Sequence, residues 1–204
     1  VLFMSIKKSK ALSYVELILV IGLIGVVAAL TVVPFKRHSQ RKELGHLAHK
    51  AYLTLEDAVD NAILTSGPIR NWGMSSSSTF CTVYLLPNMK YSSSNCAANP
   101  PYVVTKDNMK FSVRCEDTSA RYCYIDVDVN NDLNPNKTGK DQFEFQISRT
   151  SVPDAKGLPI VYDAESVKPA GWGGADILML NGWEFTDKLW DCDWSQESAY
   201  TNCK

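Results

Sequence analysis

Residues 7–35 read KKSKALSYVELILVIGLIGVVAALTVVPF, and this stretch decides the architecture of the chain. No charged side chain occurs between Leu17 and Val33. Such a run reaches the lower limit of about 17 residues for a helix that spans a bilayer. Lysines precede the run, so the positive-inside rule places the N-terminus in the cytoplasm and the rest outside it. Glu16 stands at the start of the run, where a carboxylate costs about 2.5–3.5 kcal/mol on insertion scales.

Two ordinary explanations of this stretch are a signal anchor and a cleaved secretory signal peptide. Val27-Ala28-Ala29 has the small residues that a signal peptidase accepts. Two features count against cleavage there. The apolar run continues to Val33, and Glu16 interrupts the start of an ordinary signal-peptide core.

The residues after the run keep a helical period. Between residues 36 and 65 the apolar side chains recur every three or four positions. They are Leu44, Leu47, Ala48, Ala51, Leu55, Ala58, Val59, Ala62 and Ile63. Ser66-Gly67-Pro68 predicts the end of this helix. Pro34 predicts a kink, so we expect one kinked helix of roughly 50 residues, transmembrane in its first half and amphipathic in its second.

Residues 67–204 have the texture of a β-rich head domain, with short apolar runs between Gly, Pro, Ser and Asn. Strands are predicted at Phe80–Leu86, Lys110–Cys115, Tyr122–Val129, Gln142–Arg149, Ile160–Tyr162 and Asp176–Leu180. Ser92–Ser94 is predicted as loop. The expected fold class is α+β, with the amphipathic half of the helix packed on an antiparallel sheet.

All six cysteines follow residue 80. An even number downstream of a membrane-targeting segment predicts disulfides in an oxidising compartment. Six cysteines allow 15 connectivities. Local pairing is favoured, as Cys81–Cys96, Cys115–Cys123 and Cys192–Cys203.

One cluster of oxygen-bearing side chains suits calcium, which takes six to eight oxygen ligands. Its expected ligands are Asp128, Asn130, Asp132 and Asp141. The spacing is not that of an EF-hand. The alternative is a polar turn between two strands, because Asn, Asp, Pro and Gly favour turns for backbone reasons. Both interpretations stay open, and no other cofactor is expected.

Catalysis and nucleic-acid binding are not expected. The net charge is −1, and no motif suggests a bound nucleic acid. The histidines at 38, 46 and 49 all precede the head, which excludes a Ser-His-Asp or Cys-His site within it. Near the C-terminus, Trp183, Trp190 and Trp194 suggest either a carbohydrate-binding surface or aromatic packing beside Cys192.

The N-terminal pattern resembles that of type IV pilins and type II secretion pseudopilins. The shared features are a basic leader, a small residue, an apolar residue, and a glutamate at the fifth position of a long apolar helix. The resemblance covers residues 7–66. The run IDVDVNNDLNPNKTGKDQFEF at 125–145 also resembles a segment of small pilin-like proteins.

The resemblance implies a processing site and a role for the acid. Cleavage follows Ala11, Leu12 becomes the N-methylated first residue, and Glu16 becomes the fifth. The family usually has Gly and Phe where this chain has Ala11 and Leu12. In such filaments the glutamate pairs with the N-terminal amine of a neighbour, and Gly22, Gly25 and Pro34 match positions that soften the helix.

The chain is therefore expected to be a structural subunit, a major or minor pilin or a pseudopilin. Its partners are other pilin-like subunits, the prepilin peptidase that also methylates the new N-terminus, and the bacterial inner membrane, before it enters an extracellular or periplasmic filament. The expected segments are a leader (1–11), a membrane and filament-core helix (12–35), an amphipathic helix (36–66) and the head (67–204). Met4 as the start would leave a short leader. The alternative is a signal-anchored or secreted disulfide-bonded binding domain.

Overall fold

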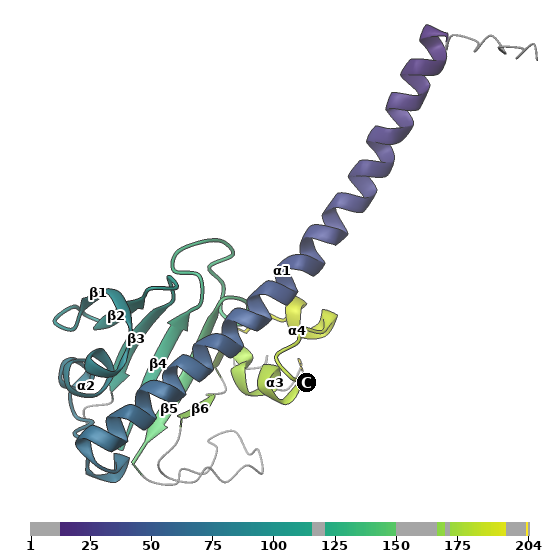
Figure 1. Ribbon diagram of the computed structural model, residues 1–204. Coiled ribbons are helices and arrows are strands. Elements are labelled where there is room, and N and C mark those ends of the chain that lie inside the picture. The colour runs from purple at the N-terminus through teal and green to yellow at the C-terminus, as the bar shows by residue number, and fades with distance from the viewer. Residues whose placement is uncertain (1–12, 116–120, 150–166, 170–171, 195–202, 204) are drawn as a thin grey trace, which may run out of the picture. The chain divides into compact units, whose positions relative to one another are not determined.

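The computed structural model describes residues 13–115, 121–149, 167–169, 172–194 and 203 (Figure 1). The chain divides into two compact units, residues 1–40 and residues 41–204. Helix α1 runs from Tyr14 to Ser66 and contributes to both. The predicted cleavage residues Ala11 and Leu12, and the strand predicted at Ile160–Tyr162, lie outside the described residues.

Helix α1 ends at Ser66, as the sequence predicts, and it continues through Pro34 without a break. At its C-terminal end Gly67 adopts φ of 79°, and its N–H donates to the carbonyl of Ile63 at 2.9 Å. A left-handed residue after the last turn is the usual helix C-cap and strongly favours glycine. Pro68 then follows, where the helix cannot continue.

Within the second unit, one face of α1 is buried. Leu55, Ala51 and Ala62 are fully covered, as are most of the other residues of the predicted apolar stripe. Small residues dominate this face, which lets the helix lie close to the sheet. The amphipathic second half of the helix is confirmed.

The sheet is an antiparallel meander of six strands in the order β1-β2-β3-β4-β5-β6. The strands are β1 Tyr91–Asn95, β2 Tyr102–Thr105, β3 Lys110–Cys115, β4 Tyr122–Asp128, β5 Gln142–Ser148 and β6 Val167–Pro169. Three of them match predicted strands within a residue. The α+β class is confirmed.

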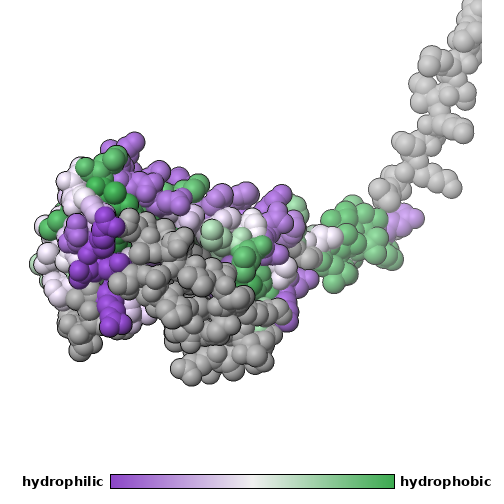
Figure 2. Space-filling model, turned by 90° about the horizontal axis from the view of Figure 1, so that it is seen from below, coloured by the Kyte–Doolittle hydropathy of each residue, from purple (hydrophilic) through white to green (hydrophobic). Residues whose placement is uncertain are grey.

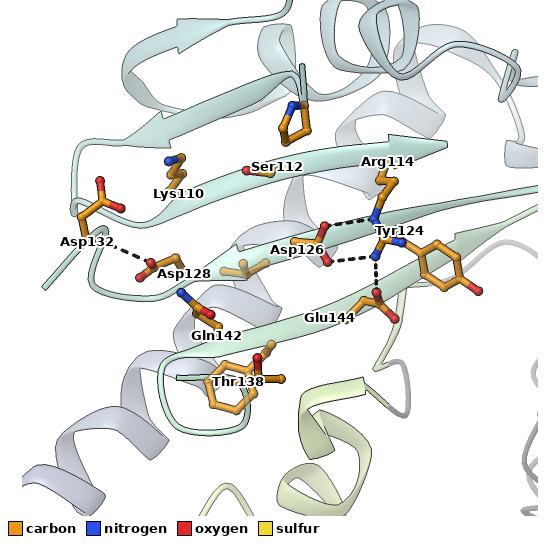
Figure 3. Close-up of a pocket in the computed structure, with 13 residues that line it drawn as sticks. Lys110, Ser112, Arg114, Tyr124, Asp126, Asp128, Asp132, Thr138, Gln142 and Glu144 are labelled. Carbon is orange, nitrogen blue, oxygen red and sulfur yellow. Dashed lines mark hydrogen bonds and ion pairs between the residues drawn. The ribbon is translucent and has the colours of Figure 1, made fainter. Parts of the chain in front are cut away.

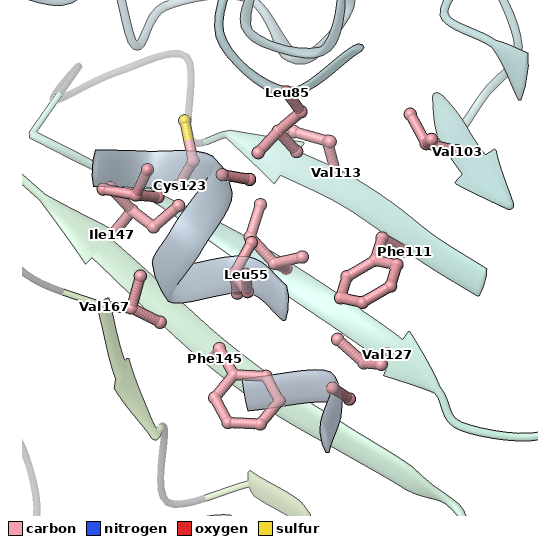
Figure 4. Packing of buried hydrophobic residues seen from close by; sticks show 14 of the residues in the cluster. Leu55, Leu85, Val103, Phe111, Val113, Cys123, Val127, Phe145, Ile147 and Val167 are labelled. Carbon is pink, nitrogen blue, oxygen red and sulfur yellow. The ribbon is translucent and has the colours of Figure 1, made fainter. Parts of the chain in front are cut away.

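The inner face of the sheet forms the core with α1. Alternate residues of β3, β4 and β5 are buried, as a half-buried strand requires. Figure 4 shows Leu55 of α1 among Val113, Phe111 and Phe145 of the sheet. The opposite face of these strands is polar.

The prediction of a strand at Phe80–Leu86 is wrong. This segment is helical, as α2 Ser77–Phe80, a π-helical turn at Cys81–Leu85 and a 3-10 turn at Leu86–Asn88. The Ser76 hydroxyl caps α2 by accepting from Thr79 N. The buried residues Phe80, Cys81, Tyr84 and Leu85 fall at helical spacing. A short apolar run bounded by turn residues does not distinguish a strand from a buried helix.

The prediction of a strand at Asp176–Leu180 is wrong for the same reason. Helix α3 spans Ala175–Leu180 and follows a 3-10 turn at Trp172–Gly174. A further helix, α4, spans Asp187–Asp191. Ser92–Ser94, predicted as loop, lies in the edge strand β1, whose side chains are mostly exposed. An exposed edge strand lacks the apolar alternation on which the prediction depended.

Three disulfides link the predicted pairs, Cys81–Cys96, Cys115–Cys123 and Cys192–Cys203. Cys115 and Cys123 are directly opposed across β3 and β4. No free cysteine occurs among the described residues.

Candidate functional site

The first unit presents an apolar helical surface. Every described side chain from Tyr14 to Thr31 is exposed, and Leu23 is 64% exposed. Figure 2 shows hydrophobic atoms over the visible face of this segment. Among the described residues, α1 is the one helix that is long and apolar enough to cross a membrane, a property that an N-terminal signal sequence shares. Monomeric soluble proteins rarely expose a patch of this extent.

Glu16 lies in the first turn of α1 and caps it. Its Oε2 accepts a hydrogen bond from the backbone N–H of Ser13 at 2.8 Å. A Ser-x-x-Glu sequence places the acid where it can satisfy one of the donors that a helix start leaves free. An acid in the first turn also complements the helix dipole. Glu16 therefore has a structural role within a single chain.

Within this segment, the Thr31 hydroxyl is hydrogen-bonded inside the helix and the two glycines have free space around them. The Thr31 hydroxyl donates to the carbonyls of Val27 and Ala28, at 2.9 and 3.2 Å. This satisfies the hydroxyl without water, as a hydrocarbon environment requires. A Cβ added to Gly22 or Gly25 would meet nothing within 4 Å. Neither glycine is required for packing within the chain.

The outer face of the sheet carries a polar groove of about 690 Å³ (Figure 3). Arg114 of β3 lies at one end of it. Its guanidinium donates to both carboxylate oxygens of Asp126 at 3.3 Å and to Glu144 at 2.5 Å. The guanidinium also lies 5.1 Å from the centre of the Tyr124 ring. One cation thus joins two carboxylates from β4 and β5.

Glu144 is only 8% exposed, and it lies directly opposite Asp126 in the sheet register. Like charges placed directly opposite each other destabilise a sheet. Burial and the charge of Asp126 raise the pKa of Glu144 to about 7, against the opposing effect of Arg114. Glu144 therefore titrates near neutral pH within the groove.

The four expected calcium ligands lie between the end of β4 and the start of β5, where hydrogen bonds join Asn130 and Asp132 to Asp128, and Asn130 to Asp141. Asp141 is fully buried, and its oxygens accept from Asn136 N and Lys137 N, each at 2.7 Å. Asp128 accepts from the backbone N–H groups of Asn130 and Asp132. Burial raises the pKa of Asp141, although the backbone N–H groups of Lys137 and Asn136 act to lower it. The carboxylates of Asp128 and Asp141 thus accept hydrogen bonds from the backbone of the turn.

The fit of this turn to a metal is limited. Among the side-chain oxygens of the four expected ligands, Asn130 Oδ1 is buried and accepts no hydrogen bond. The Nδ2 of the same residue donates to Asp141 at 3.3 Å. No group of three or more His, Cys, Asp or Glu side chains placed to hold a metal occurs in the part of the chain that the structure describes. The hydrogen bonds favour the polar turn over calcium.

The C-terminal tryptophans pack within the second unit. Trp190 and Trp194 are each 5% exposed. Trp183 stacks on His49, with ring centres 5.2 Å apart. A Cβ on Gly139 would lie 2.0 Å from the Trp194 ring, so this ring fills the space that the glycine leaves. These rings therefore offer no open platform for a sugar, and aromatic packing is the better explanation.

Comparison with models of known protein families, with curated proteins and with solved structures finds no match to this chain. The resemblance to pilins therefore rests on the residues of the sequence.

Two features of the site were missed from the sequence. The Ser13–Glu16 cap had a signal, since Ser-x-x-Glu before an apolar run is typical of a capping box. The sequence contains only a partial signal for the cluster of Arg114, Asp126 and Glu144. Alternation places each side chain on the outer face of its strand, but the register that joins three strands is not local in sequence.

Proposed function

We propose that this chain is a structural subunit of a type IV pilus-like or type II secretion filament, either a pilin or a pseudopilin. The observation that carries the proposal is the apolar segment of α1, which is exposed on all described side chains and continues without a break into the helix that anchors the head. A span followed by a free linker would suit a simple anchor equally well. In this chain no linker intervenes, because the apolar segment and the amphipathic segment belong to one helix, Tyr14–Ser66.

Glu16 is the residue that gives the assembly its register. Cleavage after Ala11 would leave the amine on Leu12, adjacent to the Ser13 N–H that Glu16 already accepts. The pKa of such an amine is about 7.7–8.0, so it is cationic near neutral pH. Glu16 Oε1 is then available to the amine of a neighbouring copy. A lateral ion pair removes most of the cost of placing a carboxylate in lipid.

Gly22 and Gly25 are consistent with contact beyond the single chain. Since neither glycine is needed for packing within the chain, their small size is best used against a neighbouring helix. Helices in lipid associate closely where small residues let their backbones approach.

The test is assembly of Glu16 variants in cells that produce the full chain. We expect Glu16→Val and Glu16→Gln to abolish or strongly reduce sheared filaments, because both remove the charge that pairs with the amine. The head should keep its melting temperature, since Glu16 is not part of its core. Glu43→Gln, an exposed acid on the same helix, is the matched control and should assemble normally. Normal filaments from Glu16→Val would contradict the charge-pair mechanism.

The second candidate is a signal-anchored or secreted binding domain, and the outer groove favours it. Its volume of about 690 Å³ lies within the range of small-molecule sites. Its lining offers hydrogen-bonding side chains from three strands. If this candidate is right, Arg114→Ala will abolish binding of a carbohydrate found by array screening of the full chain, while Glu16→Val will change neither binding nor cellular location. Under the filament proposal, Glu16→Val is the variant with the phenotype.

A further inference from the structure

The outer groove is the cavity of about 690 Å³ on the polar face of the sheet (Figure 3). More acidic than basic side chains line it: Asp126, Asp128, Asp132 and Glu144 against Lys110 and Arg114. A concave surface with an excess of one charge focuses the field and raises the local concentration of counter-ions. The outer groove therefore favours a ligand that carries positive charge.

Both basic side chains of the lining make contacts within the head. The Arg114 guanidinium donates to Asp126 and Glu144, and so joins carboxylates from two strands. Lys110 lies opposite Asp128 in the register of β3 and β4, yet its ammonium group is 5.4 Å from the centre of the Tyr102 ring. The end of the groove at Arg114 thus already holds a cation, and Lys110 makes no ion pair within the described residues.

The acids at the other end of the groove have no cation of their own. Figure 3 shows Asp128 and Asp132 at the end away from Arg114. Asp128 accepts two backbone N–H groups of its own turn. Neither acid forms an ion pair in the part of the chain that the structure describes, where the ion pairs of the groove are those of Arg114. The negative charge that the head leaves uncompensated is therefore at this end.

The rest of the lining suits an organic molecule better than a metal ion. Ser112, Thr138 and Gln142 present hydroxyl and amide groups, which both donate and accept hydrogen bonds. Pro100 adds carbon surface at the wall of the groove. Small-molecule sites combine such surface with a few polar groups that fix the orientation of the ligand. No group of three or more His, Cys, Asp or Glu side chains placed to hold a metal occurs among the described residues.

We propose that the outer groove binds a small organic cation of the amino-sugar class. The ammonium group pairs with Asp128 and Asp132, because a charge-assisted hydrogen bond is roughly twice as strong as a neutral one. The hydroxyl groups of the sugar bond to Ser112, Thr138 and Gln142. The inference rests on the groove that the second candidate function uses and is independent of filament assembly, because every residue of the groove belongs to the second unit.

The test is isothermal titration calorimetry of the full chain in detergent with glucosamine, N-acetylglucosamine and glucose. The buffer keeps the amine of glucosamine protonated. The three sugars share one ring and differ in a single substituent, so the charge is the variable. We expect saturable binding of glucosamine that weakens as salt is added, because salt screens the attraction between exposed charges. The two neutral sugars should bind much more weakly.

Variants that change the charge of the groove in opposite directions should have opposite effects. Asp132→Asn should weaken glucosamine binding about two- to fivefold, as expected for an exposed ion pair. Asparagine tolerates the left-handed backbone at this position, where φ is 62°, so the melting temperature should not change. Lys110→Met should instead tighten binding by a similar factor, because it removes a cation beside Asp128. Glu184→Gln, at an exposed acid outside the groove, is the control and should bind as wild type does.

Equal affinity for the three sugars would overturn the cationic ligand and leave the second candidate function intact. Heats that do not saturate, or that Asp132→Asn and Glu184→Gln reduce equally, would overturn the site itself. Calcium chloride that displaces glucosamine at a lower concentration than the sugar requires would assign the acids to a metal and contradict the proposal. The filament proposal is decided separately, by the assembly of the Glu16 variants.

Discussion

Leu23 and Leu55 are both leucines on α1, yet the first is 64% exposed and the second is fully buried. The two halves of the helix therefore differ in whether their apolar side chains are buried. In residues 41–66 the helix is amphipathic, and its apolar face is used by the sheet of its own chain. In residues 14–31 the helix is almost wholly apolar, and every side chain that the structure describes there is exposed. Exposed apolar area of this extent is typical of a membrane span or a signal sequence, and the filament proposal adds other helices as a second kind of partner.

Replacing each of the two leucines by alanine should give the largest difference in stability between the two halves of α1. We expect Leu55→Ala to lower the free energy of unfolding of the head by about 2–5 kcal/mol, because it leaves a cavity between α1 and the sheet. Leu23→Ala should leave the stability of the head unchanged. Chemical denaturation of the full chain in detergent, followed by tryptophan fluorescence, measures both. Equal effects of the two variants would contradict the division of α1.

The glycines of α1 provide a second matched pair. A Cβ on Gly45 would lie 2.3 Å from the carbonyl oxygen of Trp183, whereas one on Gly22 would meet nothing. We expect Gly45→Ala to destabilise the head by about 1–3 kcal/mol through overpacking, although alanine is the better helix former. Gly22→Ala should not affect the head. The comparison is made by thermal unfolding, and a stabilised Gly45→Ala variant would show that the turn at Trp183 is not held against the helix.

The acids of the two regions should differ in their effect on how the free energy of unfolding of the head depends on pH. The pKa of Glu144 is raised from 4.5 to about 7 in the folded state. The unfolded chain releases this proton first, so the free energy of unfolding falls as pH rises from about 4.5 to 7. Glu144→Gln mimics the protonated acid, and we expect it to stabilise the head by about 1–2 kcal/mol at pH 8 and to have little effect below pH 5. Glu16→Gln should leave the pH profile of the head unchanged. Urea titrations across this range would contradict the account if wild type and Glu144→Gln had parallel profiles.

The smallest effect is expected from calcium. Because the oxygens of Asp141 already accept backbone N–H groups, the melting temperature of the head should be the same in calcium and in EDTA. A bound ion at 100 times its dissociation constant would add about 2.7 kcal/mol of stability, which calorimetry would detect. A rise in melting temperature with calcium, lost in Asp141→Asn, would revive the metal site.

What the sequence predicted well is governed by local rules. The end of α1 at Ser66, the buried stripe and the strand β3 follow from caps and periodicity, which need only neighbouring residues. Disulfides between near neighbours in sequence follow from their short loops. The capping role of Glu16 is also local, because it follows from the Ser-x-x-Glu spacing of residues 13–16.

What the sequence did not predict depends on contacts between distant residues. Phe80–Leu86 and Asp176–Leu180 contain strand-like residues, but tertiary packing makes both helical. The meeting of Arg114, Asp126 and Glu144 depends on the register of three strands. The burial of Trp194 depends on the space at Gly139, more than 50 residues away in sequence. None of these follows from a pattern within one segment.

The central claim is that the chain is cleaved just before the apolar half of α1 and that this half is used for assembly. The most direct test is the mass and N-terminal sequence of the protein recovered from cell envelopes or sheared filaments. The account predicts a chain that begins at Leu12 and is heavier by one methyl group. A chain that begins at Leu30 would show removal of the apolar segment and would contradict the claim. An uncut chain would contradict processing and would support a plain signal anchor.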